Sequence, residues 1–572
     1  MARLKSKHSA LKSLSCKFGG LGKYTPLSPT GAEEMCNFRI LPGGVLKTRM
    51  GYQLKKSFSS SQKVRGVWQG RIEDVSYLFA VAGDTIYRLT DDTMSEATIV
   101  GKIPANDRPV HFCAYLDNLY LLDETNIYLY SSRQNRFNAI EAYVPLYGYQ
   151  WHPELFGDVY EEINLLSRHL RIHYSNTDGS TVFRFPYYAD AVDFVYINGR
   201  SSTKYTFSPG SDHITTTAEN PPFFVEVGIT ITLNEEIREK LLASQLSFIY
   251  NLKEESKLFL WGNDSRVFCS RHVSDYMLSS CRVFYSSTTP LYFCSDDILF
   301  LGDSTHPVTA LCSFYDTILA FTADRIWNIR FEKEGMEVKL ATREMGCASP
   351  FGVIPYRNSV LAIMGKDFYR ISASVARTDE LTFERLSQGM ETRIGSNYAT
   401  RGQLFWNVSD DEIWMRDPQK SNGEVLVWNT KSEEWYRFDN IAGAFFFKTD
   451  SGIGFAQNNN IFYFDRSYAT DNKNPIEAFY RSSYLDFGTP DVPCRSGRAY
   501  LYCSANDGEG SLLLETERGG KVFHFSPSPS YANAYLQKIR FGGYRYRFLR
   551  FTISANASTP AEFYRLDIHT LP

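Results

Sequence analysis

A short pattern of apolar residues recurs along the chain and predicts a β-hairpin each time. An apolar residue in one strand is followed, after a turn, by another apolar residue eight or nine positions later with an aromatic beside it. Successive instances fall mostly about forty to fifty residues apart, the spacing of β-propeller blades. The seven instances are Leu78 with Ile86 and Tyr87, Leu119 with Ile127 and Tyr128, Phe259 with Val267 and Phe268, Ile318 with Ile326 and Trp327, Val360 with Phe368 and Tyr369, Leu404 with Ile413 and Trp414, and Ile453 with Ile461 and Phe462. We therefore expect an all-β fold with a roughly seven-bladed propeller.

Turn residues stand where this pattern needs them. Gly83 and Asp84 separate two expected strands, Tyr77–Ala82 and Thr85–Leu89, and tight hairpins favour this pair because glycine adopts positive φ. Turn residues in comparable positions are Asn126, Asp324, Asp367 and Asn460. Turn chemistry and hydrophobic period therefore agree.

Residues 135–250 interrupt the repeat and predict an inserted β-domain. Four segments there alternate as half-buried strands do: Leu170–Tyr174, Thr181–Phe185, Val192–Ile197 and Val225–Thr232. Asn234 to Gln245 resembles a short helix, because the acids Glu235 and Glu236 fall at its start, where the helix dipole favours them. It is the only helix that we expect.

The repeat stops after Phe464, and the last hundred residues predict a β-sandwich. Six short strands separated by Gly, Asn and Pro are expected. They are Ile476–Tyr480, Arg498–Cys503, Ser511–Glu515, Leu536–Phe541, Tyr546–Ile553 and Ala561–Ile568. The predicted domains are an N-terminal arm and hairpin (1–55), a first set of blades (56–134), the inserted β-domain (135–250), a second set of blades (251–470) and the C-terminal sandwich (471–572).

The N-terminal twenty residues are basic and carry no acid, with glycines at their end. This composition favours an extended arm over a folded element. Two interpretations remain open: a disordered, solubilising tail, or an arm that docks on an acidic neighbouring subunit or on nucleic acid.

Composition narrows the class of protein. Aromatic residues make up 15% of the chain, which suits β-sheet surfaces, and the net charge of -3 predicts no global attraction to nucleic acid or anionic membranes. No apolar run reaches the roughly eighteen residues of a membrane span, and no signal sequence is recognisable. The ten cysteines lack C-x-x-C spacing, so we expect them to be buried free thiols in a protein made in a reducing cytoplasm.

No catalytic constellation can be assembled from the sequence, and we expect no enzyme, no cofactor and no metal site. The chain has no G-x-S-x-G, Walker or H-E-x-x-H motif. His169 and His173 stand four positions apart on one strand face, roughly 13 Å from each other, too far to share a metal ion. Three acidic clusters fall where turns are expected and could otherwise serve glycan cleavage or calcium binding. They are Asp91-Asp92, Ser295-Asp296-Asp297 and Asp410-Asp411-Glu412.

Tryptophans and arginines near the repeat allow two interpretations each. Trp327, Trp414, Trp428 and Trp435 are expected to pack between blades, with a sugar-stacking platform as the alternative. A set of arginines is expected to lie as solvated charges at blade edges, with a ring facing a channel as the alternative. These arginines are Arg88, Arg325, Arg370, Arg416 and Arg437.

Three short motifs follow one another near the N-terminus. They are Phe18-Gly19-Gly20-Leu21, then Glu33 to Arg39, then Gly43-Gly44-Val45-Leu46-Lys47-Thr48-Arg49-Met50-Gly51-Tyr52. In this order they resemble the "GGL" segment, acidic turn and "GG-x-L-x-x-R-x-G-Y" hairpin that precede a propeller in the phage tail hub and nozzle proteins of short-tailed phages. Further similar segments are Leu260 to Asn263, Phe284 to Ser286, Leu291 to Phe293 and Gly346 to Ser349.

The resemblance implies a structural virion protein located in the tail. Such proteins form ring-shaped homo-oligomers, usually hexamers, that conduct DNA during ejection and mount fibres and other tail or connector proteins. The alternative that we keep is a carbohydrate- or host-binding propeller, a tail-tip adhesin. It predicts exposed aromatic residues in the insertion around Tyr143 to Trp151.

Overall fold

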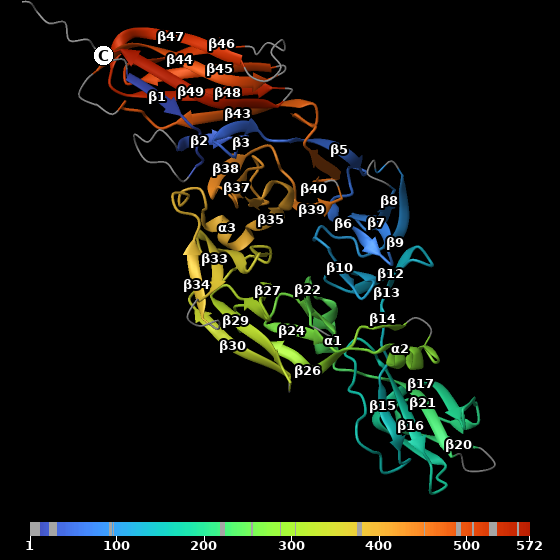
Figure 1. The fold of residues 1–572 in the computed structure, drawn as a ribbon. Helices are drawn as coiled ribbons and strands as arrows, with labels where there is room; N and C mark the ends of the chain where they lie inside the picture. The colour runs from blue at the N-terminus through green and yellow to red at the C-terminus, as the bar shows by residue number, and fades with distance from the viewer. Residues whose placement is uncertain are drawn as a thin grey trace, which may run out of the picture. The chain divides into compact units, whose positions relative to one another are not determined.

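The computed structural model describes most of the chain, and it is almost entirely β (Figure 1). The described residues are 12–21, 31–90, 94, 96–217, 223–252, 255–285, 288–303, 305–333, 335–374, 380–450, 452–487, 493–505, 508–525, 535–557 and 560–571. They divide into two compact units. Unit 1 comprises Met1–Gln69, Thr90–Glu96 and Phe314–Pro572, and unit 2 comprises Gly70–Leu89 and Ala97–Ser313. The expected all-β class is confirmed.

All seven hairpins that the repeat predicts are present as adjacent antiparallel strands. Each hairpin pairs at least one repeat residue across its two strands, as where Ile86 pairs with Val81 and Phe368 pairs with Ile363. The pairs are β7 (Val75–Ala82) with β8 (Thr85–Leu89), β11 (Asn118–Leu122) with β12 (Ile127–Ser131), β23 (Ser256–Trp261) with β24 (Arg266–Ser270), β28 (Thr317–Phe321) with β29 (Arg325–Glu332), β32 (Ser359–Met364) with β33 (Asp367–Ala373), β35 (Gln403–Asn407) with β36 (Glu412–Arg416), and β40 (Gly452–Gln457) with β41 (Asn460–Asp465).

Six of these hairpins belong to separate four-stranded sheets. The sheet orders are β6-β7-β8-β9, β10-β11-β12-β13, β22-β23-β24-β26, β27-β28-β29-β30, β31-β32-β33-β34 and β35-β36-β37-β38. The additional strands are β6 (Val64–Ile72), β9 (Ala97–Lys102), β10 (His111–Tyr115), β13 (Arg136–Ala139), β22 (Leu246–Asn251), β26 (Phe293–Phe300), β27 (Ala310–Phe314), β30 (Gly335–Arg343), β31 (Val353–Tyr356), β34 (Leu381–Arg385), β37 (Val425–Asn429) and β38 (Glu434–Phe438). Small antiparallel sheets of this size are the units of a propeller. A ring of seven blades stays a prediction.

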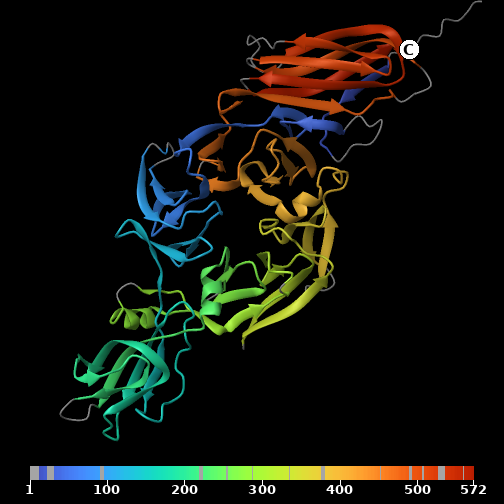
Figure 2. The same cartoon turned by 180° about the vertical axis from the view of Figure 1, so that it is seen from behind.

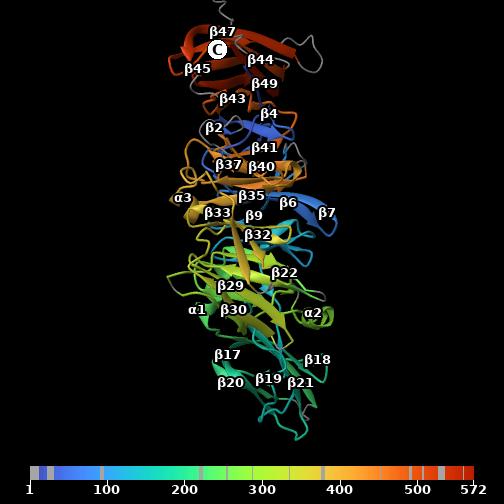
Figure 3. The same cartoon turned by 60° about the vertical axis from the view of Figure 1, so that its left-hand side comes forward.

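A larger sheet in unit 2 forms from residues 146–231 (Figure 3). Its order is β15 (Leu146–Trp151), β16 (His169–Ser175), β21 (Phe224–Ile231), β17 (Val182–Ile197), β20 (Ser211–Thr216) and β19 (Tyr205–Thr206), with β18 (Arg200–Ser201) beside β17. Two of the expected strands, Thr181–Phe185 and Val192–Ile197, are one continuous strand, β17. Register shifts beside Ala189 and Val192 let this strand pair with β20 along its first part and with β21 along its second.

The described residues contain more α-helix than the sequence predicted. The expected helix is α1 (Glu235–Leu242), with Asn234 as its N-cap. Two helices were missed: α2 (Asp275–Arg282), capped by Ser274, and α3 (Ser396–Arg401), which follows Gly395. At eight and six residues they are too short for a clear helical period in the sequence.

The C-terminal strands of unit 1 form two sheets. One has the order β3 (Phe38–Leu41), β4 (Val45–Thr48), β49 (Ala561–Leu571), β44 (Cys494–Ala505) and β47 (Tyr535–Tyr546), with β1 (Lys12–Cys16) also on β49. The other runs β39 (Phe445–Thr449), β40, β41, β5 (Gly51–Ser57), β42 (Thr470–Asp471), β43 (Asn474–Ser482), β48 (Leu549–Ala557), β45 (Gly508–Thr516) and β46 (Gly519–Phe525), with β2 (Ala32–Cys36) on β43.

The N-terminal strands are therefore part of this C-terminal architecture. Figure 2 shows them, in blue, against the red C-terminal strands. Lys12–Cys16 was expected to be an arm, and that prediction is wrong, because this segment pairs along its length with Leu566–Thr570. Residues 1–11, which carry the rest of the predicted arm, lie outside the described residues.

The N-terminal motifs are built into the core of unit 1. Phe18 packs edge-on against Tyr480, with ring centroids 5.3 Å apart, and the Leu21 amide donates to the Trp435 carbonyl at 2.7 Å. A Cβ on Gly20 would lie 2.5 Å from that carbonyl oxygen, and one on Gly51 would lie 2.1 Å from the Thr470 carbonyl oxygen. Both positions require glycine because backbones approach too closely for any side chain.

The ten cysteines are buried free thiols, as predicted. They fill apolar positions rather than bridging strands. No helix in the described part of the chain has the length and apolarity needed to cross a membrane.

Candidate functional site

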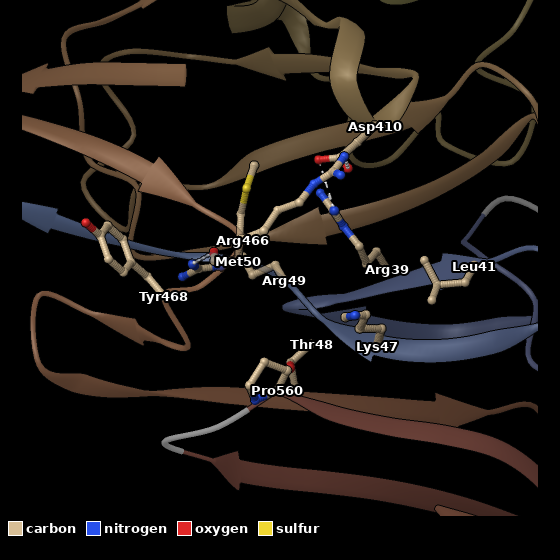
Figure 4. A pocket seen from close by; sticks show the side chains of 10 residues that line it. All are labelled: Arg39, Leu41, Lys47, Thr48, Arg49, Met50, Asp410, Arg466, Tyr468 and Pro560. Carbon is tan, nitrogen blue, oxygen red and sulfur yellow. Dashed lines mark hydrogen bonds and ion pairs between the residues drawn. The ribbon is translucent and has the colours of Figure 1, made fainter. Parts of the chain in front are cut away.

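A cavity of about 280 Å³ lies in unit 1 beside the β3–β4 hairpin, and we call it the arginine pocket (Figure 4). Four segments supply its walls: the hairpin with the two residues that follow it, the 3₁₀ turn before β36, the turn after β41, and Pro560 just before β49. Its lining residues are Arg39, Leu41, Lys47, Thr48, Arg49, Met50, Asp410, Arg466, Tyr468 and Pro560.

Arg39 forms the inner wall of the arginine pocket. Its Nη1 lies 3.0 Å from Asp410 Oδ2, and its Nη2 lies 2.9 Å from Glu412 Oε2. Glu412 also accepts from Trp414 Nε1 at 2.9 Å and from the Tyr436 hydroxyl at 2.5 Å. Burial raises the pKa of Glu412, and the Arg39 charge opposes that rise. The carboxylate therefore depends on Arg39 for its charge.

Arg49 lies beside Arg39 and joins three segments of unit 1. Its Nε donates to Asn37 Oδ1 at 2.9 Å, its Nη2 donates to the Asp439 carbonyl at 3.0 Å, and its guanidinium forms a bidentate pair with Asp471 at 2.8 and 2.5 Å. The Arg49 side chain is 1% exposed and that of Asp471 is 6% exposed. Because both charges are buried, removing either Arg49 or Asp471 would leave the other charge buried without a partner, at a large cost in stability.

A second feature is a row of four rings at the sheet of unit 2, three of them exposed and one half-buried, which we call the aromatic ridge. It consists of Tyr160, Tyr149, His173 and Phe224, with successive ring centroids 5.5, 5.4 and 5.8 Å apart. Tyr149, Tyr160 and Phe224 are 49%, 60% and 50% exposed. Burial lowers the pKa of His173, so its neutral ring stacks with the others at neutral pH.

Polar groups lie around the aromatic ridge. Gln150 Nε2 lies 3.4 Å from the Tyr149 hydroxyl, and Glu226 pairs with His173 across β16 and β21. The ridge stands on the sheet face opposite the core, because Leu170, Ile172 and Tyr174 point the other way and are fully buried. Exposed aromatic rings with interspersed polar groups mark interaction surfaces.

The expected aromatic surface around Tyr143 to Trp151 is only partly present. Tyr143, Tyr147 and Trp151 are buried, whereas Tyr149 is exposed. Tyr160, His173 and Phe224 complete the ridge from other segments, and the sequence did not point to them. The period-2 alternation of β16 placed His173 on the same face as His169, but it could not show which rings flank it.

The two histidines on β16 have separate surroundings. His169 hydrogen-bonds Asp193 at 2.8 Å and Thr230 at 3.1 Å, whereas His173 belongs to the aromatic ridge. Among the described residues no group of three or more His, Cys, Asp or Glu side chains is arranged to hold a metal ion.

Several acids of the three clusters form ion pairs with arginine or lysine, as Asp411 does with Lys431. Ser295-Asp296-Asp297 was expected in a turn, but it lies within the strand β26. Asp410 pairs with Arg39 and with Arg466, and Asp297 pairs with Arg271. Glu412 was expected in a turn, but it is a buried strand residue of β36. Asp91-Asp92 lies outside the described residues.

The tryptophans pack as expected, with one exception. Trp414, Trp428 and Trp435 are at most 2% exposed and belong to the core of unit 1. Trp327 is only half-buried, next to the fully buried Ile326 of β29.

The expectation of solvated arginines is wrong for Arg416, which is 1% exposed and lies over the Phe446 ring at 5.4 Å. Arg88 and Arg370 are half-buried over Tyr77 and Trp428. Arg325 pairs with Asp324, and Arg437 lies 3.8 Å from Glu424. Cation–π contacts with aromatic rings therefore stabilise Arg88, Arg370 and Arg416.

Comparisons with known proteins do not place the chain in a family. No family model matches it, and no curated protein matches it. Similar solved structures include the AfRom2 CNH domain, at 7% identity and a TM-score of 0.36 over 72% of this chain and 98% of that one. Another is the extracellular domain of a putative one-component system from B. thetaiotaomicron, at 9% identity and a TM-score of 0.26 over 90% of this chain and 62% of that one.

A third similar structure is the exo-beta-1,3-galactanase from Phanerochaete chrysosporium with galactose, at 8% identity and a TM-score of 0.16 over 80% of this chain and 95% of that one. These identities and TM-scores are too low to transfer a role to this chain.

We expect the replacement Arg49→Met to lower the free energy of unfolding of unit 1 by about 3–5 kcal/mol, because it leaves Asp471 buried without its partner. The double variant Arg49→Met with Asp471→Leu should regain most of that loss. The measurement is urea unfolding followed by tryptophan fluorescence, since Trp414, Trp428 and Trp435 lie in the core of unit 1.

The matched control is Arg565→Met, which removes an ion pair to Asp567 from an arginine side chain that is 48% exposed. It should change the free energy of unfolding by about 1 kcal/mol or less. Equal effects of Arg49→Met and Arg565→Met would contradict a central role for the buried pair.

Proposed function

We propose that the protein is a host-surface-binding protein of a virion tail that binds carbohydrate through the aromatic ridge. The observation that carries this proposal is the contiguous row of Tyr160, Tyr149, His173 and Phe224, three of which are about half exposed or more. The apolar C–H faces of sugars pack on aromatic rings, and nearby amide and carboxylate groups accept or donate to hydroxyls. Gln150 and Glu226 are placed to do this.

A virion tail is the setting that the N-terminal motifs favour. Phe18-Gly19-Gly20-Leu21 and Arg49-Met50-Gly51-Tyr52 resemble the tail hub and nozzle family, and both perform close-packing roles here. Their glycines meet carbonyls that leave no room for a Cβ. A non-enzymatic role is part of the proposal, because Asp297, Asp410 and Glu412 are held in ion pairs with arginines.

We expect the double variant Tyr149→Ala with Tyr160→Ala to weaken binding of neutral oligosaccharides roughly tenfold, since each lost ring contact contributes about 0.5–1.5 kcal/mol. The measurement is isothermal titration calorimetry of the full chain against galacto- and gluco-oligosaccharides, with circular dichroism to confirm the fold. Tyr276→Ala is the matched control, because Tyr276 is 82% exposed on α2 and lies outside the ridge.

Two outcomes would overturn the carbohydrate-binding proposal. One is the absence of binding to any oligosaccharide tested at millimolar concentration. The other is equal affinity of the double variant and the wild type, since the sugar would then bind elsewhere.

The second candidate function is a tail hub or nozzle subunit that lines a DNA conduit. The same N-terminal motifs favour it, and it requires a homo-oligomeric ring, expected to be hexameric, with partners among other tail proteins. Multi-angle light scattering of the purified chain tests it. A closed oligomer near six copies supports the conduit, and a monomer at all concentrations favours the binding protein.

A further inference from the structure

The arginine pocket has no part in the proposed carbohydrate binding, yet its chemistry is that of a ligand site. Four cationic side chains line it: Arg39, Lys47, Arg49 and Arg466. Asp410 supplies the one carboxylate among its lining residues. A concave site with several converging cations selects for anions.

Asp410 is shared between two of these cations. Its Oδ2 lies 3.0 Å from Arg39 Nη1, and its Oδ1 lies 2.6 Å from Arg466 Nη2. Burial alone would raise the pKa of Asp410, but the charges of Arg39 and Arg466 and a hydrogen bond from Asn407 lower it below its ordinary value. Two carboxylates, Asp410 and Glu412, thus face Arg39 and Arg466, and Arg466 is the one of these two cations that solvent reaches.

Two of the cations reach solvent from different walls of the pocket. The Arg466 side chain is 67% exposed and is oriented by a bond from its Nη2 to the Ser409 carbonyl at 2.8 Å. The Lys47 side chain is 37% exposed on β4, where Glu562 lies 2.9 Å from its Nζ. Figure 4 shows Lys47 on the hairpin and Arg466 directed to Asp410 on another wall, with Arg39 between them. An anion entering from solvent would meet Arg466 and Lys47 first.

Size and lining define the ligand further. The cavity of about 280 Å³ holds a phosphate group with a short organic substituent, and Leu41, Met50 and Pro560 provide apolar contact for that substituent. Guanidinium forks match the oxygen pairs of a phosphate, and an ammonium supplies a point charge beside them. A second cavity of about 220 Å³ shares Met50, Asp410 and Arg466 with the pocket and extends the same surface.

We propose that the arginine pocket is a binding site for the phosphate group of a small phosphate ester, held by Arg466 and Lys47 with Arg39 behind them. The inference is independent of the carbohydrate-binding proposal, because the two sites lie in different units of the chain. Binding involves no covalent step.

The test is isothermal titration calorimetry of the full chain with glycerol 3-phosphate, inorganic phosphate and uncharged glycerol as probes. We expect glycerol 3-phosphate to bind with a dissociation constant in the millimolar range or below, inorganic phosphate to bind more weakly, and glycerol not to bind. Affinity for glycerol 3-phosphate should fall as salt rises, because the interaction is largely electrostatic.

The variants Arg466→Gln and Lys47→Gln should each weaken binding of glycerol 3-phosphate fivefold or more. Both side chains are solvent-accessible, so the fold should persist, and an unchanged thermal unfolding midpoint verifies this. The matched control is Arg565→Gln, which removes an exposed arginine of unit 1 that lies outside the pocket.

Three results would overturn the proposal. The first is no heat of binding with either phosphate compound, at ligand concentrations from ten times that of the protein up to the millimolar range. The second is equal binding of glycerol and glycerol 3-phosphate. The third is unchanged affinity for glycerol 3-phosphate in both the Arg466→Gln and Lys47→Gln variants. Binding of inorganic phosphate equal to that of the ester would overturn the part assigned to Leu41, Met50 and Pro560.

Discussion

The buried pair of Arg49 and Asp471 is the interaction on which unit 1 depends. The pair joins two residues that are 422 positions apart in the sequence. Arg49 also donates hydrogen bonds to Asn37 Oδ1 and to the Asp439 carbonyl oxygen. Desolvating both charges costs several kcal/mol, which the bidentate geometry and the extra hydrogen bonds offset. A less exact arrangement would leave a buried charge without compensation, so the pair specifies how the N-terminal segment sits on the C-terminal strands.

Strand pairing near this ion pair also joins the N-terminal segment to the C-terminal strands of unit 1. β5 completes the sheet of β39, β40 and β41, where Tyr52 packs edge-on against Phe455, Phe462 and Phe464 with centroids 4.9–5.6 Å away. β1 and β4 both pair with β49. Because loop closure must precede such contacts, unit 1 is expected to acquire its full core only after its last strand has been synthesised.

Local patterns in the sequence predicted local structure well. The seven hairpins, most of the C-terminal strands and α1 follow from apolar periodicity, turn residues and capping, all of which act within about ten residues. The strand β46 was missed, and Tyr546, which was expected to begin a strand, ends β47. Lys12–Cys16 was instead expected to be an arm, because it lies in a basic, glycine-flanked segment, and no local pattern shows that β49 lies beside it. Gly20 and Gly51 were noted within motifs, yet only the carbonyls of Trp435 and Thr470 explain them.

The candidate sites were less predictable than the fold, for a related physical reason. Charged residues are usually exposed, so nothing in the sequence marked Arg39 and Arg49 as buried. The aromatic ridge combines Tyr149 and Tyr160 with His173 and Phe224 from two other strands. Both sites exist only once distant segments meet, and the arginine pocket further depends on the N-terminal hairpin being fixed by the Arg49–Asp471 pair.

The central claim is that the N-terminal strands are integral to unit 1. Hydrogen–deuterium exchange of the full chain tests it most directly, by comparing amides of Gly51–Ser57 (β5) with those of Asn460–Asp465 (β41), its neighbour in the sheet. The account predicts similar, slow exchange in both segments, because they open together. Fast exchange of Gly51–Ser57 beside a protected Asn460–Asp465 would contradict it.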